Sequence, residues 1–475
     1  MANTENKESG GLVSAAFPTA DASDPDAPRG YFLSLGAGRH QTPLIAAAHR
    51  LGFPVVAVDR DLKAPGFAHA TVQLQCSITR PRRILEMLNE STRPIPVAGV
   101  GCRSFGRAGM TAAILAHAHN TPGNELRVLR RFQNKRRLKA QLALAGVPVP
   151  PAFACGTLAE RDALRACEET LLVRPASGHG KFGLRLLTNQ ADRNRFLQIH
   201  LRDTGKLLIE ALTPGQEVTV LGIVQHGRYS PICLSDKHVS QRPPLFIELG
   251  HDFPARISAQ ERADIDAHMQ SIVDTTGLRH GPIVAEFILR ESATNSEEAK
   301  SGRREALLVE CAPEIGGEYL ADVLVPAMLG DDRAGADLDS GGGRAQDRGG
   351  LHHRLDYFEE LVRLYTGGVF RTEDFAAAIA EPKHQVSIRF LPQQAGTLES
   401  IALPENLSRT PGFLFAHLLK TAGAQTSLEG GNPDRLAVFG LRGPWRPNAP
   451  ASDQEPIREL ANQIARQIQD RIEYQ

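Results

Sequence analysis

Two consecutive apolar segments in the second half of the chain each carry one acid. Glu286 lies in GPIVAEF (281–287) and Glu310 lies in LLVECAPEIGG (307–317). If these segments pair as antiparallel strands, the two carboxylates lie side by side and each raises the pKa of the other. A divalent cation removes this conflict, and Mg²⁺ prefers one or two carboxylates together with water and phosphate oxygens. The pattern predicts a shared magnesium site; two separate surface acids are the alternative.

A glycine-rich loop has a cation before it and a cation within it. In LLVRPASGHGKFG (171–183), an apolar strand leads to Arg174, and glycines surround Lys181. Glycine lets backbone amides approach phosphate oxygens, and the cations supply the opposite charge. No GxxxxGK[ST] sequence occurs in the chain, so this is not a Walker loop. The segment predicts a different kind of phosphate-binding loop.

A proline-glycine turn separates two further acids. In LLIEALTPGQEV (207–218), Glu210 ends an apolar strand and Glu217 follows the turn. This arrangement suits a nucleotide, because backbone groups can bind adenine and a carboxylate can accept hydrogen bonds from both ribose hydroxyls. The alternative is an ordinary loop between strands with two solvated acids.

The segment GAGRHQ (36–41) follows an early strand, and Asp59 ends the next strand. Together they partly match a dinucleotide-binding fingerprint, but Gln41 replaces its third glycine. A tight turn between strand and helix in a doubly wound domain is the alternative. An NAD-dependent oxidoreductase therefore stays among the hypotheses.

Composition excludes several classes of protein. The 54 basic and 54 acidic residues balance, so no nucleic-acid or other polyanionic partner is indicated. No cysteine or histidine pattern has zinc-site spacing. Residues 1–29 are polar and lack the apolar core of a signal peptide, and no apolar run is long enough to span a membrane. We therefore expect a cytoplasmic protein.

The pattern of elements predicts an α/β protein. Strands and helices alternate from Tyr31 to about residue 120, which favours a parallel sheet with covered faces. Longer strands follow Glu217, interrupted by a polar excursion over 291–304, and the last helix has an apolar stripe. The expected parts are a disordered tail (1–29), a Rossmann-like domain (30–130), a small lid subdomain (131–215), a large mixed-sheet subdomain (216–383) with a mobile insert (330–350), and a C-terminal α+β domain (384–475).

In this order the segments resemble the ATP-grasp superfamily, and within it the carboxylate–amine ligases that include the L-amino-acid ligases. The resemblance covers about residues 30–475. It adds Lys135, in FQNKRRLKAQLALAGVPVP, as the first phosphate-binding lysine, and Lys237, in SDKHVSQRPP, as the lysine that reaches the terminal phosphate. The fold it implies is the ATP-grasp fold, with the domains given above.

The resemblance also implies the ligands and the remaining roles. ATP and Mg²⁺ are the expected cofactors, and Arg174 stands where a second lysine is usual. The implied nucleotide ligands are Lys135, Arg174, Lys181, Glu210, Ala211, Glu217 and Lys237, with Lys237 and Arg174 catalytic; Glu286 and Glu310 are the implied metal ligands. Small-molecule carboxylate and amine substrates are the implied partners, and the chain is expected to form a homodimer.

Two positions depart from the family pattern. Ala312 replaces a common asparagine, so one metal-ligand oxygen is missing, and Glu314 replaces an arginine that commonly contacts a substrate carboxylate. The reversed charge predicts a substrate with a positively charged or carboxylate-free end near Glu314; a salt bridge to a local arginine is the alternative. Gly316 and Gly317 are expected to let substrate approach the backbone.

The expected reaction is ATP-dependent formation of an acylphosphate, which an amine converts to an amide or peptide with release of phosphate. ADP is the other product. A purine-pathway ligase or transformylase of the same superfamily is one alternative. A nucleotide-binding protein without catalytic activity is another, because of Ala312 and Glu314.

Overall fold

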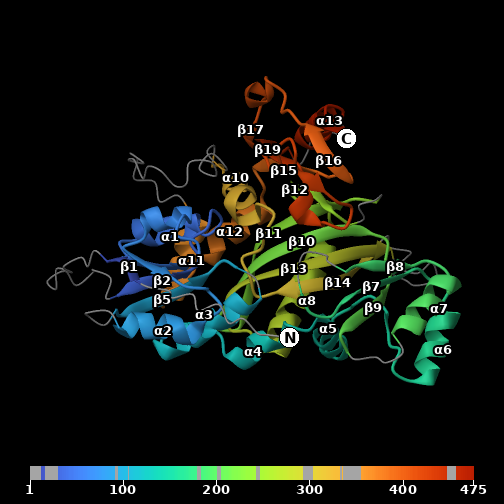
Figure 1. Ribbon diagram of the computed structural model, residues 1–475, viewed down its shortest axis with the longest axis horizontal. Coiled ribbons are helices and arrows are strands. Elements are labelled where there is room, and N and C mark those ends of the chain that lie inside the picture. Colours follow the sequence, from blue (N-terminus) through green and yellow to red (C-terminus); the bar gives the residue numbers. More distant parts are fainter. Residues whose placement is uncertain are drawn as a thin grey trace. The chain divides into compact units, whose positions relative to one another are not determined.

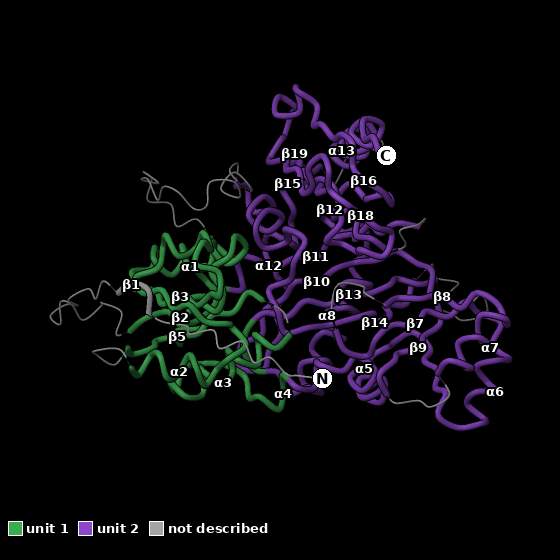
Figure 2. The backbone as a smooth tube through the Cα atoms, in the orientation of Figure 1, with its two compact units in different colours: residues 1–129, 279–281, 336–371 green, residues 130–278, 282–335, 372–475 purple. Residues whose placement is uncertain are grey.

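The computed structural model describes residues 12–15, 30–90, 95–104, 106–178, 183–200, 205–241, 246–291, 303–331, 334, 355–446 and 456–475. Lys181, most of the polar excursion and most of the insert 330–350 lie outside these residues. The chain divides into two compact units (Figure 2): unit 1 comprises residues 1–129, 279–281 and 336–371, and unit 2 comprises residues 130–278, 282–335 and 372–475. No helix in the described part of the chain is long and apolar enough to cross a membrane.

Unit 1 contains a five-stranded sheet of order β1-β4-β3-β2-β5. Strands β2 to β5 pair in parallel, which confirms the predicted parallel sheet, and β1 pairs antiparallel with β4. Strand β1 lies within the segment predicted to be a disordered tail, where a short apolar sequence extends the sheet edge. The elements are β1 (Leu12–Ala15), β2 (Tyr31–Leu35), α1 (Thr42–Arg50), β3 (Val55–Asp59), β4 (Val72–Gln75), α2 (Pro81–Glu90), β5 (Val97–Cys102), α3 (Arg107–Ala118) and α11 (Tyr357–Tyr365).

Helix α11 belongs to unit 1, not to the large subdomain in which the sequence analysis placed it. It packs on α1 and β5, and a Cβ atom on Gly99 of β5 would lie 2.6 Å from the carbonyl oxygen of Tyr365. Arg50 of α1 forms ion pairs of 2.6 Å with both Asp356 and Glu359. The apolar face of α11 is therefore buried by a sheet more than 200 residues earlier in the chain.

The first part of unit 2 is a small antiparallel sheet of order β6-β9-β7-β8. Helices α6 and α7 contact each other beside it (Figure 1), and their apolar residues join those of the sheet in one core. Thr157 caps α6 and Asn189 caps α7 through side-chain oxygens. The elements are α5 (Lys135–Leu144), β6 (Ala152–Phe153), α6 (Leu158–Ala166), β7 (Leu171–Pro175), β8 (Arg185–Leu187), α7 (Gln190–Ile199) and β9 (Leu207–Ala211).

Unit 2 also contains an eight-stranded sheet of order β14-β13-β10-β11-β12-β15-β19-β17 and a three-stranded sheet of order β18-β16-β20. The last three strands of the eight-stranded sheet come from the segment that the sequence predicts to be a separate C-terminal domain. They continue the sheet because β15 pairs along β12, with His251 opposite Ile388. The strands of this sheet are β10 (Gln216–Gln225), β11 (Arg228–Val239), β12 (Glu248–Phe253), β13 (His280–Glu291), β14 (Arg304–Ala312), β15 (His384–Leu391), β17 (Phe413–Leu418) and β19 (Ala437–Pro444).

The predicted apolar stripe of the last helix packs within the chain. Ile457, Ile464 and Ile468 are buried in a core with residues of β15 and β19, and Leu460 and Ile472 pack against it. The other elements are α4 (Leu126–Arg131), α8 (Ala259–Thr276), η2 (Leu320–Leu324), α10 (Val325–Met328), α12 (Thr372–Ala380), β16 (Gly396–Ser400), β18 (Gln425–Thr426), α13 (Pro456–Gln469) and β20 (Glu473–Tyr474), with short 3₁₀ turns η1 (Pro65–His69), η4 (Leu407–Arg409) and η5 (Asn432–Asp434).

Candidate functional site

The two predicted metal ligands, Glu286 and Glu310, are direct neighbours. Strands β13 and β14 are antiparallel, and Glu286 lies opposite Glu310 in their register. Their side chains are 28% and 33% exposed, so both remain accessible. Within the described residues, no group of three or more His, Cys, Asp or Glu side chains could hold a metal ion. Two carboxylates suit Mg²⁺ when phosphate and water supply the remaining ligands; Ala312, opposite Val284, adds no side-chain oxygen.

Two predicted phosphate-binding cations contact Glu310. Lys135, the first residue of α5, places Nζ 3.2 Å from Oε1. Arg174 of β7 places Nη1 3.2 Å from Oε2. Each carboxylate oxygen of Glu310 therefore has its own cation. The Arg174 ion pair joins the small sheet to the large sheet of unit 2, and the Lys135 ion pair joins α5 to the large sheet.

Glu210 lies deeper, and both of its carboxylate oxygens are engaged. Oε2 accepts a hydrogen bond of 3.1 Å from Nη2 of Arg174, and Oε1 forms an ion pair with Lys139. The backbone N–H of Ala211 donates to the carbonyl oxygen of Pro151 at 2.8 Å. The side chain of Glu210 thus holds two cations, of which Lys139 is not among the residues predicted from the sequence. Its position four residues after Lys135, on the same helix face, was the available signal.

Lys237 of β11 lies in a group of three acids. Nζ is 2.6 Å from Glu286, 2.7 Å from Glu248 and 3.8 Å from Glu217, which is its cross-strand neighbour. Burial alone lowers the pKa of this ammonium, but the charges of Glu248, Glu286 and Glu217 hold its pKa well above the ordinary value. Lys237 is therefore charged at neutral pH. Glu248 was not identified from the sequence, because nothing in its local segment places it near Lys237.

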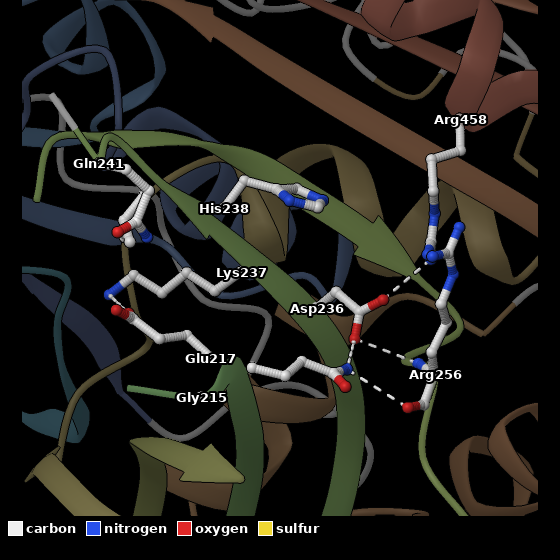
Figure 3. Close-up of a pocket in the computed structure, with 10 residues that line it drawn as sticks. Gly215, Glu217, Asp236, Lys237, His238, Gln241, Arg256 and Arg458 are labelled. Carbon is white, nitrogen blue, oxygen red and sulfur yellow. Dashed lines mark hydrogen bonds and ion pairs between the residues drawn. The ribbon is translucent and has the colours of Figure 1, made fainter. Parts of the chain in front are cut away.

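A polar cavity of about 320 Å³ lies at the ends of β10 and β11 (Figure 3). Glu217 and Lys237 point toward each other on one side of it, and Asp236 points toward Arg256 and Arg458 on the other. Side chains alternate across a strand, so neighbouring residues 236 and 237 face opposite ways. The volume is in the range of small-molecule sites. Its lining includes Glu217, the predicted ribose ligand, which is 19% exposed, and Lys237, a predicted phosphate ligand, which is buried.

The early fingerprint forms a turn. The backbone N–H of Ala37 donates to Oδ2 of Asp59 at 2.9 Å, and that of Asp61 donates to Oδ1 at 3.0 Å. Asp59 thus holds the loop after β2 and the loop after β3 together. This geometry favours the tight-turn interpretation of GAGRHQ.

The segment after β14 contains the predicted substrate residues. Glu314 donates its backbone N–H to the carbonyl oxygen of Ala312 at 2.9 Å, and Gly316 has a φ of +79°. Glu318 and Tyr319 follow with φ values of 58° and 62°, a conformation that costs non-glycine residues about 1–3 kcal/mol each and is found mainly at functional sites. The contacts of Gly317 with substrate stay a prediction, as do those of Glu314 and Gly316.

Glu318 joins this segment to the acids around Lys237. It forms an ion pair with Arg435, whose guanidinium lies 3.7 Å from the centroid of the Phe390 ring. Asn432 donates to Glu248 at 2.7 Å. Burial and the charge of Glu248 raise the pKa of Glu318 to about 8, against the opposing effect of Arg435.

Glu318→Gln is expected to change how stability depends on pH. Because the folded pKa is raised, the favourable contribution of Glu318 is complete below its unfolded pKa of about 4.3 and is lost as pH rises through about 8. Glutamine does not titrate, so the variant lacks this loss. Its free energy of unfolding should therefore rise relative to that of the wild type as pH increases from about 5 to about 9. Urea denaturation across this range measures the difference. A constant difference would contradict the prediction.

A family model and several solved structures are similar to this chain. Residues 132–279 match the family model of the ATP-grasp domain. The fold is similar to that of an L-amino acid ligase from Bacillus licheniformis (TM-score 0.68, 16% identity, covering 94% of this chain and 99% of that chain). It is also similar to phosphoribosylglycinamide synthetase from Anaerococcus prevotii (TM-score 0.64, 14% identity, 94% and 99%).

A third similar structure contains a nucleotide. It is the biotin carboxylase domain of 2-oxoglutarate carboxylase from Hydrogenobacter thermophilus, in complex with MgADP, ADP and bicarbonate (TM-score 0.60, 15% identity, covering 94% of this chain and 91% of that chain). The chain carries an ATP-grasp domain and has the ATP-grasp fold, as the sequence predicts.

Proposed function

We propose that this protein is an ATP- and Mg²⁺-dependent ligase that joins a carboxylate to an amine. The observation that carries the proposal is the register of Glu286 opposite Glu310, with Lys135, Arg174 and Lys237 within ion-pair distance of these two acids. The two acids have the charge needed to hold a metal ion, and the three cations have the charge needed to hold a triphosphate. The similarity to an L-amino acid ligase adds support for the reaction class.

The existing ion pairs can exchange partners when MgATP binds. Glu286 and Glu310 would hold Mg²⁺, which supplies a Lewis acid that neutralises phosphate charge. Lys135, Arg174 and Lys237 would turn from these acids to phosphate oxygens, with Lys181 as a further proposed phosphate ligand. Glu217, 19% exposed and beside the cavity, is the proposed ribose ligand. The backbone around Glu210 and Ala211 is the proposed adenine edge.

The proposed chemistry has two displacement steps. An oxygen of the substrate carboxylate attacks the terminal phosphorus, the bond from that phosphorus to the ADP oxygen breaks, and ADP leaves. The amine nitrogen then attacks the acyl carbon, phosphate leaves, and the amine releases its extra proton to solvent. Lys237 and Arg174 offset charge on the transferred group, so catalysis rests on positioning and electrostatics. No protein nucleophile is needed.

The substrates are proposed to approach along Glu314, Gly316 and Gly317. A cationic or carboxylate-free end would suit Glu314. A homodimer is part of the proposal. The similarity to phosphoribosylglycinamide synthetase keeps a purine-pathway ligase as a second candidate, and Ala312 keeps a non-catalytic nucleotide-binding protein as a third.

Hydroxylamine trapping tests the acylphosphate. The purified protein with MgATP and a panel of amino acids and other small acids should form a hydroxamate with at least one acid, because hydroxylamine replaces the amine. Phosphate release with pairs of acids and amines then identifies the natural acceptor. MgATP binding without hydroxamate or phosphate release across the panel would instead support the non-catalytic candidate.

A further inference from the structure

Lys139 is a buried cation that the proposed reaction does not use. It lies one helical turn after Lys135 in α5, its side chain is 6% exposed, and it is paired with Glu210. Burial lowers the pKa of its ammonium to about 8, with Glu210 opposing and Arg174 adding to the effect. Stability alone does not explain such a pair, because apolar residues of similar volume often replace a buried ion pair without loss. A role in the site is the alternative.

The contacts of Arg174 indicate that role. Its Nη2 donates to Glu210 at 3.1 Å and to the carbonyl oxygen of Val309 at 2.9 Å, while Nη1 donates to Glu310 at 3.2 Å. Its buried Nε has no hydrogen-bond partner among the described residues. If Glu310 turns toward a metal ion, Glu210 and Val309 become the groups that orient the guanidinium. Glu210 itself is then fixed by Lys139.

We propose that Lys139 is a positioning residue for Arg174, which it orients through Glu210. By holding Oε1 of Glu210, Lys139 keeps Oε2 in place for Nη2 of Arg174, so that Nη1 is free to turn to the phosphates of the nucleotide. The inference rests on the proposed function, because it assumes that Arg174 binds phosphate. Lys139 contacts neither substrate nor metal in this scheme.

Binding of MgATP and of adenosine to four variants tests the proposal by calorimetry. Lys139→Met should weaken MgATP binding about tenfold, which corresponds to about 1.4 kcal/mol. Adenosine has no phosphate, so its affinity should stay within about twofold. Lys139→Arg should recover most of the loss, because it keeps the charge. Arg137→Met, which removes an exposed cation from the same helix, is the matched control and should bind both ligands normally.

The double variant Lys139→Met/Glu210→Gln guards against misfolding, because it leaves no buried charge at either position, and Arg174 keeps Glu310 as its counter-charge. It should melt close to the wild type and still bind MgATP weakly. MgATP affinity within twofold of wild type in the single or the double variant would overturn the proposal. So would an equal loss for adenosine and MgATP. A wild type that binds no MgATP would overturn the proposed function and this inference together, whereas unchanged variants of a binding wild type overturn the inference alone.

Discussion

Glu286→Gln and Glu310→Gln are each expected to lower Mg²⁺-dependent ADP formation at least about a hundredfold. A metal that neutralises phosphate charge contributes several kcal/mol to the transition state, and each 1.36 kcal/mol is a factor of ten in rate. With only two carboxylates at the proposed metal site, losing either one leaves a single protein carboxylate to hold the ion. The measurement is ADP formation as a function of magnesium concentration.

The fold should survive both changes. Lys237 keeps Glu248 and Glu217 when Glu286 is neutralised, and Arg174 keeps Glu210 when Glu310 is neutralised. Glu305→Gln is the matched control, because Glu305 lies on the same strand as Glu310 and pairs with Arg290 at a more exposed position. Near-native turnover of either site variant at saturating magnesium would refute the shared metal site.

Asp252→Asn is expected to destabilise the protein by about 3–5 kcal/mol, the usual cost of breaking a buried ion pair. Asp252 of β12 is 1% exposed and accepts hydrogen bonds from Arg389 at 2.8 and 2.9 Å. Arg458 of α13 lies 3.0 Å from the same carboxylate. Asparagine would leave two buried guanidinium groups without their shared counter-charge. Chemical denaturation measures the loss in the free energy of unfolding.

The loss should depend on pH. Burial alone raises the pKa of Asp252, but Arg389 and His238 hold it well below the ordinary value. A lowered pKa gives stability that is present above the unfolded pKa of about 3.9 and is lost as pH falls below it. The difference between wild type and variant should therefore shrink in acid.

Asp264→Asn is the matched control for Asp252. Asp264 pairs with Arg303 at 2.7 Å at the surface, where an ion pair is worth about 0–1 kcal/mol. A loss at Asp252 no larger than that at Asp264 would show that the buried network does not stabilise the fold.

The sequence by itself predicted which acids and cations of the candidate site lie on neighbouring strands. Glu286 and Glu310 are on consecutive strands joined by one connection, so local pairing was enough to place them together. The pairing of Glu217 with Lys237 also joins consecutive strands. The parallel sheet of unit 1 follows from alternating strands and helices, whose pattern is local.

Only the tertiary structure decided the partners that are distant in the chain. Lys139 meets Glu210 across 71 residues, and Arg174 meets Glu310 across 136. Helix α11 and strand β15 also have partners that are distant in the chain: α11 packs in unit 1, and β15 pairs with β12. A pattern of apolar residues specifies that a face must be buried, but not which surface buries it. A buried charge likewise requires a counter-charge, and only the folded chain determines which residue supplies it.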